Sequence, residues 1–202
     1  MPFRMSRSEY AAIYGPTTGD RIRLGDTDLV ALIEGDDTSY GNEVVRGWQK
    51  TLRAGMMVAH RSVGDSELDG LISNVIIMDP VMGIFKKASI GIKDGIIVGI
   101  GRAGNPDIMD GVDLVIGRNT NNYSGDGLIA TPGGVDSHVH VGSPRLNPVA
   151  LSSGLTTFIG AGLQTNGHFT IRKYFEGFEG LPINVGLQAI GSSTHPDPMI
   201  ES

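Results

Sequence analysis

One stretch decides the fold that this sequence predicts: Leu128-Ile-Ala-Thr-Pro-Gly-Gly-Val-Asp-Ser-His-Val-His-Val-Gly142. Its apolar start is typical of a β-strand, and His138 and His140 follow two residues apart. Side chains at i and i+2 of a strand point to the same face of the sheet, so both imidazoles can bind one metal ion where the strand ends and its loop begins. Asp136 lies one pair further back on that face, where a carboxylate can orient a histidine ligand.

The histidine pair by itself does not establish a metal site. The chain has 5 histidines among 202 residues, so a His-x-His pair can arise by chance. Two strand-end histidines that bind no metal therefore remain an alternative at this point.

Composition and charge describe an ordinary globular protein and exclude several functional classes. The chain has 16 basic and 22 acidic residues, a net charge of −6, which argues against nucleic-acid binding. It has no cysteine, hence no disulfide framework, thiolate zinc site or cysteine nucleophile. The N-terminus lacks the apolar run of a signal peptide, and no apolar stretch approaches the ~20 residues that a membrane helix needs. We expect a cytoplasmic chain that does not associate with membranes.

The residues before Leu128 predict one short helix and many short strands. Ser6-Arg-Ser-Glu9 fits a capping box for a helix that ends at Gly15-Pro16. Short strands are expected around Ile22 and over 29–33, and a loop over 35–40.

A β-hairpin is the strongest local prediction in this part of the chain. An apolar strand is expected over 71–78, followed by a hairpin over 88–100 whose turn is Asp94-Gly95. Gly99-Ile-Gly-Arg-Ala-Gly104 matches the Gly-x-Gly-x-x-Gly pattern of dinucleotide sites, which requires a helix directly behind it. Asn105-Pro-Asp107 predicts a turn instead, so we do not interpret this pattern as a dinucleotide site.

The pattern after Leu128 changes to alternating strands and helices. A β-α-β-α-β order implies a parallel sheet with right-handed crossovers. The elements expected after the histidine strand are a short helix from Pro148, a strand over 155–159, a helix over 169–178, a strand over 183–190 and a further helix opened by Pro196.

Several blocks of the sequence resemble the urease α (catalytic) subunit. The segment from Ser6 to Leu29, which contains Tyr-Gly-Pro-Thr-Thr-Gly-Asp-Arg-Ile-Arg-Leu, is similar to the opening of that family. Residues 35–44 resemble its next block, and Arg53-Ala-Gly-Met56 stands where the family has Arg-Asp-Gly-Met. The Pro-Gly-Gly-Val-Asp-Ser-His-Val-His run of 132–140 resembles the metal-binding end of the first barrel strand in the amidohydrolase superfamily.

The resemblance implies a β-rich N-terminal domain over 1–127, followed over 128–202 by the first three β/α units of an incomplete (β/α)8 metal-dependent hydrolase barrel. A complete barrel takes ~250 residues, so three of its eight strands fit here. We expect the sequence to be a fragment, a split half or a degenerate relative of a urease α-type protein.

The resemblance also implies a chemistry, namely hydrolysis of urea to ammonia and carbamate at a dinickel centre. Only His138 and His140 carry over by motif, as ligands of one nickel ion, and no catalytic residue does. Nickel is inherited from the family, since two imidazoles would suit zinc equally. The family's partners are smaller β- and γ-type subunits, so we expect an oligomer.

Two loops depart from the family pattern and leave the substrate preference open. Residues 141–146 replace the family's Phe-Ile-x-Pro-Gln-Gln, and the family's Gly-rich loop is reduced over 160–167. His168 and His195 match no family motif and are expected to be exposed loop histidines, and His60 is expected to be a surface or packing residue.

Two alternative functions remain. A different binuclear amidohydrolase, of the dihydroorotase or hydantoinase kind, shares the Pro-Gly-x-x-Asp-x-His-x-His run but lacks the N-terminal blocks. A non-catalytic structural or assembly component would keep the β-rich domain and its contacts. The resemblance implies that a carbamylated lysine on a later strand bridges the two metal ions, with two further histidines and an aspartate as ligands, and no motif here matches them. We expect the isolated chain to be inactive, because its final lysine, Lys173, lies on a predicted helix that faces outward from a barrel.

Overall fold

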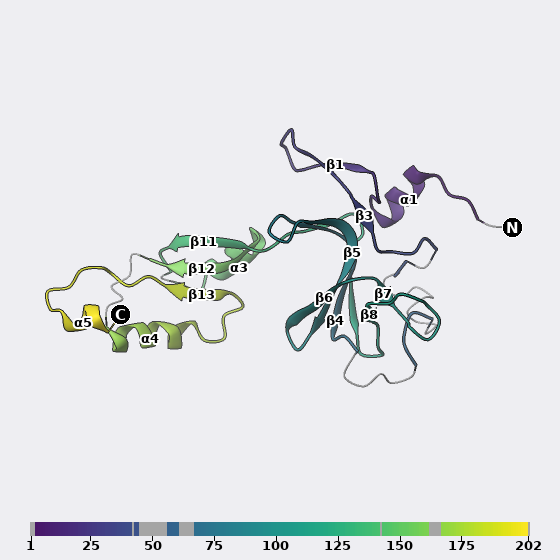
Figure 1. Cartoon of the computed structure of the whole chain (residues 1–202). Coiled ribbons are helices and arrows are strands. Elements are labelled where there is room, and N and C mark those ends of the chain that lie inside the picture. Colours follow the sequence, from purple (N-terminus) through teal and green to yellow (C-terminus); the bar gives the residue numbers. More distant parts are fainter. Residues whose placement is uncertain are drawn as a thin grey trace. The chain divides into compact units, whose positions relative to one another are not determined.

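The chain forms two compact units, Met1–Thr131 and Pro132–Ser202 (Figure 1). The computed structural model describes residues 3–41, 43–44, 56–60, 67–141, 143–161 and 167–201. Residues 53–55 of the Arg53–Met56 block therefore lie outside the described residues, as do 142 and 162–166 of the two altered loops. None of the described helices is long and apolar enough to cross a membrane.

The first unit begins with helix α1, Arg7–Tyr14, which has the predicted capping box. The Ser6 hydroxyl accepts a hydrogen bond from the Glu9 backbone N–H, while the Glu9 carboxylate accepts one from the Ser6 backbone N–H at 2.8 Å. These two bonds satisfy N–H groups that the first helical turn otherwise leaves without partners. Gly15 ends the helix with φ of 79°.

A six-stranded mixed sheet forms the body of the first unit. Its centre is the long antiparallel pair β4 and β5, which β6 extends as an antiparallel hairpin, while β3, β9 and β10 add in parallel. Two further pairs stand apart from this sheet, β1 with β2 and β7 with β8. The strands are β1 Arg21–Arg23, β2 Val30–Leu32, β3 Gly35–Asp36, β4 Gly70–Asp79, β5 Ile84–Lys93, β6 Ile96–Gly101, β7 Ala103–Gly104, β8 Leu114–Val115, β9 Asn121–Ser124 and β10 Ile129–Ala130.

The β5–β6 hairpin confirms the predicted turn. Asp94 and Gly95 have φ of 50° and 75°, so both central residues are left-handed, as a two-residue turn of type I′ requires. Asp69 fixes the turn from outside, because its carboxylate accepts the Asp94 backbone N–H at 2.6 Å.

Two sequence predictions about strands were wrong. Gly35–Asp36 is a strand within the stretch expected to be a loop; it pairs with Lys86 and Lys87 of β5, the part of that strand edge that β6 does not reach. The stretch from Leu128 to Gly142 was expected to begin as the strand that carries the histidines. Its apolar start instead belongs to β10, which pairs with Ile76 and Ile77 of β4, and the histidine strand begins separately at Gly134. Pro132 lies between the two strands and has no N–H to continue a ladder.

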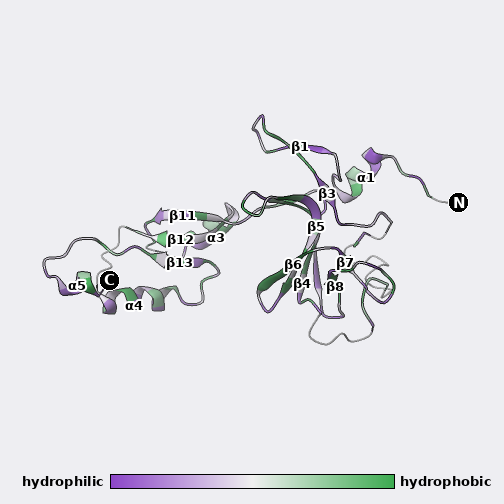
Figure 2. Ribbon diagram, viewed as in Figure 1, coloured by the Kyte–Doolittle hydropathy of each residue, from purple (hydrophilic) through white to green (hydrophobic). Residues whose placement is uncertain are grey.

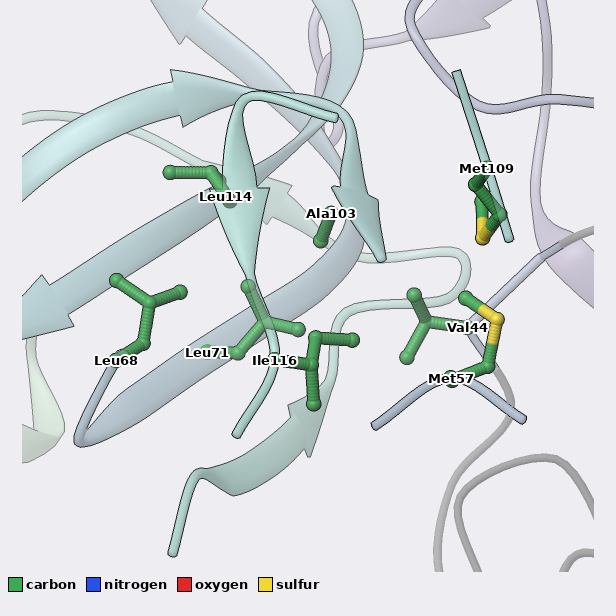
Figure 3. Packing of buried hydrophobic residues seen from close by; sticks show 8 residues of the cluster. All are labelled: Val44, Met57, Leu68, Leu71, Ala103, Met109, Leu114 and Ile116. Atoms are coloured by element: carbon green, nitrogen blue, oxygen red, sulfur yellow. The ribbon is translucent and has the colours of Figure 1, made fainter. Parts of the chain in front are cut away.

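The largest core cluster of the first unit lies where β4, β7 and β8 meet the segments that precede β4 (Figure 3). Its members share nearly complete burial: Val44, Met57, Leu68, Leu71, Ala103, Met109, Leu114 and Ile116. A second cluster, made by Val75, Ile77, Ala88 and Ile90, joins β4 to β5. Burial of this apolar surface is the main force that holds the sheet together.

The second unit is a three-stranded parallel sheet in the order β11-β12-β13, with helices in the connections (Figure 1). The β-α-β-α-β order expected after the decisive stretch is present. Val141, Ala150 and Phe158 form its small core, with Leu155, Phe178 and Ile183 packed against them. The elements are β11 Gly134–Val139, α3 Leu146–Ser152, β12 Leu155–Gly160, α4 His168–Phe178, β13 Asn184–Leu187 and α5 Asp197–Ile200.

Candidate metal-binding strand end

The two histidines lie at the carboxyl end of β11, His138 within the strand and His140 directly after it. The ladder to β12 is irregular here, with register shifts between Gly134 and Val135 and between Asp136 and Val139. Asp136 accepts a hydrogen bond from the His138 backbone N–H at 3.1 Å. Its carboxylate therefore stabilises the strand end on which both histidines are carried.

The two imidazoles are neighbours, as the i, i+2 spacing predicts. Their ring centroids lie 5.5 Å apart at an interplanar angle of 44°, and both residues are exposed to solvent. Two imidazoles on one ion, with metal–nitrogen bonds of about 2.0–2.1 Å, place their centroids about 4.5–6 Å apart. The observed separation of 5.5 Å lies within this range.

Hydrogen bonds across the sheet hold the carboxyl ends of the three strands together. The Val139 carbonyl accepts the Ala161 N–H at 2.8 Å, and the Gly160 carbonyl accepts the Gln188 N–H at 2.7 Å. The Gln188 side-chain amide also donates to the Ser137 carbonyl at 3.2 Å. Gln188 thus links the end of β13 to the histidine strand.

Sequence reasoning missed Gln188. The signal available was a polar residue directly after an apolar strand, the position at which barrel-type enzymes place functional side chains. Only the parallel sheet shows that its amide reaches a strand 51 residues earlier.

The described part of the chain supplies no third ligand beside the pair. No group of three or more His, Asp or Glu side chains able to hold a metal ion occurs among the described residues. His195 is exposed, with Nδ1 3.3 Å from the Asp197 carboxylate, and His168 is exposed at the start of α4. His60 is also exposed, and its backbone N–H donates to Asp107.

Comparison with known families shows to which family the chain belongs. The family model for the urease alpha-subunit, N-terminal domain, matches residues 3–122. The chain belongs to the urease alpha-subunit family.

Curated relatives extend the match over the whole of this urease-family chain. It is 48% identical to the urease subunit alpha of Haloquadratum walsbyi, over 100% of this chain and 37% of the relative. It is 47% identical to that of Natronomonas pharaonis, over 98% of this chain and 36% of the relative. The chain spans about a third of the length of the curated relatives that it matches.

Two solved structures are similar to this chain at low identity. An L-hydantoinase (dihydropyrimidinase) from Arthrobacter aurescens matches with a TM-score of 0.48 and 20% identity, over 66% of this chain and 30% of that one. An N-acyl-D-glutamate deacylase from Bordetella bronchiseptica matches with a TM-score of 0.43 and 22% identity, over 61% of this chain and 29% of that one.

The glycine pattern at 99–104 in this urease-family chain is part of the β-rich unit. Gly99 and Gly101 lie in β6, Gly104 ends β7, and a turn follows at 106–108. Residues 67–141 are all described, and none of them is helical. The helix that a dinucleotide site requires is therefore missing, as the turn signal predicts.

Lys173, the last lysine of the chain, forms a salt bridge on the surface of α4. Its Nζ lies 2.6 Å from the Glu176 carboxylate, and its side chain is largely exposed. Arg172 shares the same carboxylate at 2.9 Å. These salt bridges are typical of a solvated helix face and place Lys173 outside the sheet.

Proposed function

We propose that this chain is the N-terminal portion of a urease α-type subunit, which takes part in nickel-dependent hydrolysis of urea to ammonia and carbamate in the complete assembly. Residues 1–127 would be the β-rich domain of that subunit, and residues 128–202 the first three units of a (β/α)8 barrel. The partners would be the remainder of the α subunit and β- and γ-type subunits, in the cytoplasm. Membership of the family and the parallel three-stranded sheet support this assignment.

The observation that carries the proposal is the placement of His138 and His140 together at the carboxyl end of β11. In barrel enzymes the functional groups stand at this end of parallel strands. The 5.5 Å separation of the ring centroids is compatible with the binding of one ion by both imidazoles.

The residues of this chain would hold and orient one metal ion. His138 and His140 supply neutral nitrogen ligands, which suit nickel and zinc alike. Asp136 and Gln188 stabilise the backbone that carries them, through the His138 N–H and the Ser137 carbonyl. When bound, a metal pair supplies Lewis acidity and a hydroxide nucleophile at neutral pH.

Two imidazoles are half of the ligand set that a closed four-coordinate site needs. Because the described residues offer no third ligand, we propose that the isolated chain binds metal weakly and does not hydrolyse urea. The second candidate is a non-catalytic urease-like component. If no metal binds, the exposure of both histidines favours this candidate.

Metal titration tests the proposal directly. Calorimetry of the purified chain with Ni²⁺ should give one weak site, lost in His138→Ala and in His140→Ala. His168→Ala, an exposed histidine on α4, is the matched control and should retain the site. Equal nickel binding by all four proteins would overturn the assignment of His138 and His140.

A complementation assay tests the activity separately. Urea turnover should arise only when the chain is combined with the remainder of the α subunit and the smaller subunits, in the presence of nickel and bicarbonate. If His138→Ala supports the same turnover in that mixture, the histidine pair has no role in the reaction.

A further inference from the structure

A cavity of about 580 Å³ opens in the first unit beside α1. Its volume lies within the range of about 300–1,000 Å³ typical of small-molecule sites. The lining residues that bear on its chemistry are Met5, Arg7, Tyr10, Tyr14, Tyr40 and Glu43. This cavity lies outside the urease-type site and has no part in the proposed function.

Tyrosine rings form the walls of the cavity. Tyr10 lies 5.1 Å from Tyr14, tilted by 43°, and 5.1 Å from Tyr40 in an edge-to-face contact of 88°. The Tyr40 hydroxyl is hydrogen-bonded to Thr17 at 2.7 Å, which fixes the ring. A set of aromatic rings held at such angles is the arrangement that recognises organic cations through their negative faces.

A buried carboxylate completes the lining. Glu43 is 6% exposed, and both of its carboxylate oxygens accept the Gly41 backbone N–H, at 2.9 and 3.1 Å. Its position is therefore set by the backbone, and no ion pair links it to a basic side chain among the described residues.

The basic groups nearest the cavity are already committed to other carboxylates. Arg7 Nε lies 2.6 Å from Asp20, and Lys87 Nζ lies 3.9 Å from Asp36. Lys87 also lies 5.0 Å from the centroid of the Tyr10 ring, so that ring already attracts one cation within the protein. Glu43 is one of four carboxylates, with Asp20, Asp36 and Asp126, whose charges act on Lys87. Among the described residues these carboxylates outnumber Arg7 and Lys87, so the surroundings of the cavity favour a further positive charge.

We propose that this cavity binds a small organic cation, of the alkylammonium or guanidinium class, with its charge beside Glu43 and its apolar surface against Tyr10, Tyr14 and Tyr40. The tyrosine faces and the carboxylate favour the same sign of charge. The half-exposed Met5 at the rim offers further apolar contact.

Choline is the probe, and 3,3-dimethyl-1-butanol, its uncharged isostere, is the ligand control. We expect saturable shifts of the tyrosine resonances of the full chain with choline chloride at constant ionic strength, and weak or absent shifts with the alcohol. Equal responses to both compounds would show an apolar pocket without selectivity for charge and would overturn the proposal, as would no response to choline.

Variants locate the site. Glu43→Gln keeps the size and the hydrogen bond from Gly41, and Tyr14→Leu keeps the apolar bulk; each should weaken choline binding about tenfold or more. Glu179→Gln and Tyr123→Leu, changes at exposed residues elsewhere, should leave it unchanged. Circular dichroism verifies that each variant is folded. If Glu43→Gln does not fold, Tyr14→Leu by itself tests the site. Unaltered binding in a folded Tyr14→Leu protein would overturn the proposal.

Discussion

Replacement of Lys87 by methionine gives the sharpest test of what holds the first unit together. Lys87 lies on β5 with its side chain fully buried, 3.9 Å from a carboxylate oxygen of Asp36, whose own side chain is 2% exposed. The Lys87 Nζ makes no hydrogen bond among the described residues. The two side chains therefore attract each other by charge without a direct hydrogen bond, beside the backbone pairing of β3 with β5.

The expected cost of Lys87→Met is about 3 kcal/mol of unfolding free energy. Removal of one partner of a buried ion pair costs about 3–5 kcal/mol, because the remaining charge stays buried. Asp36 retains three donors, the Thr17 hydroxyl at 2.6 Å, the Thr38 N–H at 2.8 Å and the Thr38 hydroxyl, which places the cost at the lower end. Methionine fills most of the volume, so the cavity penalty of an alanine substitution is avoided.

Two further variants separate charge from packing. Lys86→Met, at the neighbouring residue, removes a 33% exposed side chain that is paired with Asp37 at 2.5 Å and should cost less than about 1 kcal/mol. The double variant Lys87→Met/Asp36→Asn should recover about 1–2 kcal/mol of the loss, because the buried Asp36 charge is then also removed.

The assay is guanidinium chloride unfolding, with hydrogen exchange of the β4–β5 amides to assign the change to the first unit. Equal costs for Lys86→Met and Lys87→Met would refute the reasoning that burial makes this ion pair matter. A double variant less stable than Lys87→Met alone would refute the role given to the Asp36 charge.

The same variant gives a pH prediction with a definite sign. Burial lowers the pKa of Lys87 from 10.5, and the carboxylates of Asp36, Asp126, Glu43 and Asp20 offset this only in part. Between the lowered pKa and 10.5 the unfolded chain binds more protons than the folded one, so stability rises with pH. The difference in unfolding free energy between the original chain and Lys87→Met should therefore grow as the pH rises from the lowered pKa of Lys87 toward 10.5. A flat difference would mean that folding does not lower the lysine pKa.

Three further predictions concern the turn, the activity and the association of the chain. Gly95→Ala should lower the stability of the first unit by about 1 kcal/mol, because Gly95 has φ of +75°, whereas Gly177→Ala inside α4 should raise helix stability by about 1 kcal/mol; equal effects in guanidinium chloride unfolding would contradict this. The purified chain with nickel and bicarbonate should show no urea hydrolysis, and turnover that His138→Ala abolishes would contradict the prediction. Sedimentation should show self-association or dependence on a partner, since Phe169 and Phe175 on α4 are 73% and 46% exposed; a stable, well-folded monomer would count against it. Figure 2 shows that α4 carries both hydrophobic and hydrophilic residues.

The sequence by itself determined the features that depend on neighbouring residues. Ser6 and Glu9 cap α1 because their side chains reach backbone groups three residues away. Asp94-Gly95 sets the hairpin because both residues tolerate positive φ. His138 and His140 lie together because strand geometry repeats every two residues.

Only the tertiary structure decided the features that join distant segments. Gly35–Asp36 becomes a strand because it pairs with β5 at Lys86 and Lys87. The hairpin partner β6 pairs only with the later part of β5, from Ser89 to Lys93. The pairing of Gly35–Asp36 with β5 buries Lys87 against Asp36. Composition cannot reveal this, since a lysine within a strand is ordinarily exposed.

The same distinction holds for the candidate sites. The histidine pair could be predicted because both ligands come from one strand, but Gln188 could not, since its contact with Ser137 spans 51 residues. The tyrosine cavity likewise combines α1 with Tyr40 and Glu43. No periodicity links these segments, and they meet only because the folded chain packs them together.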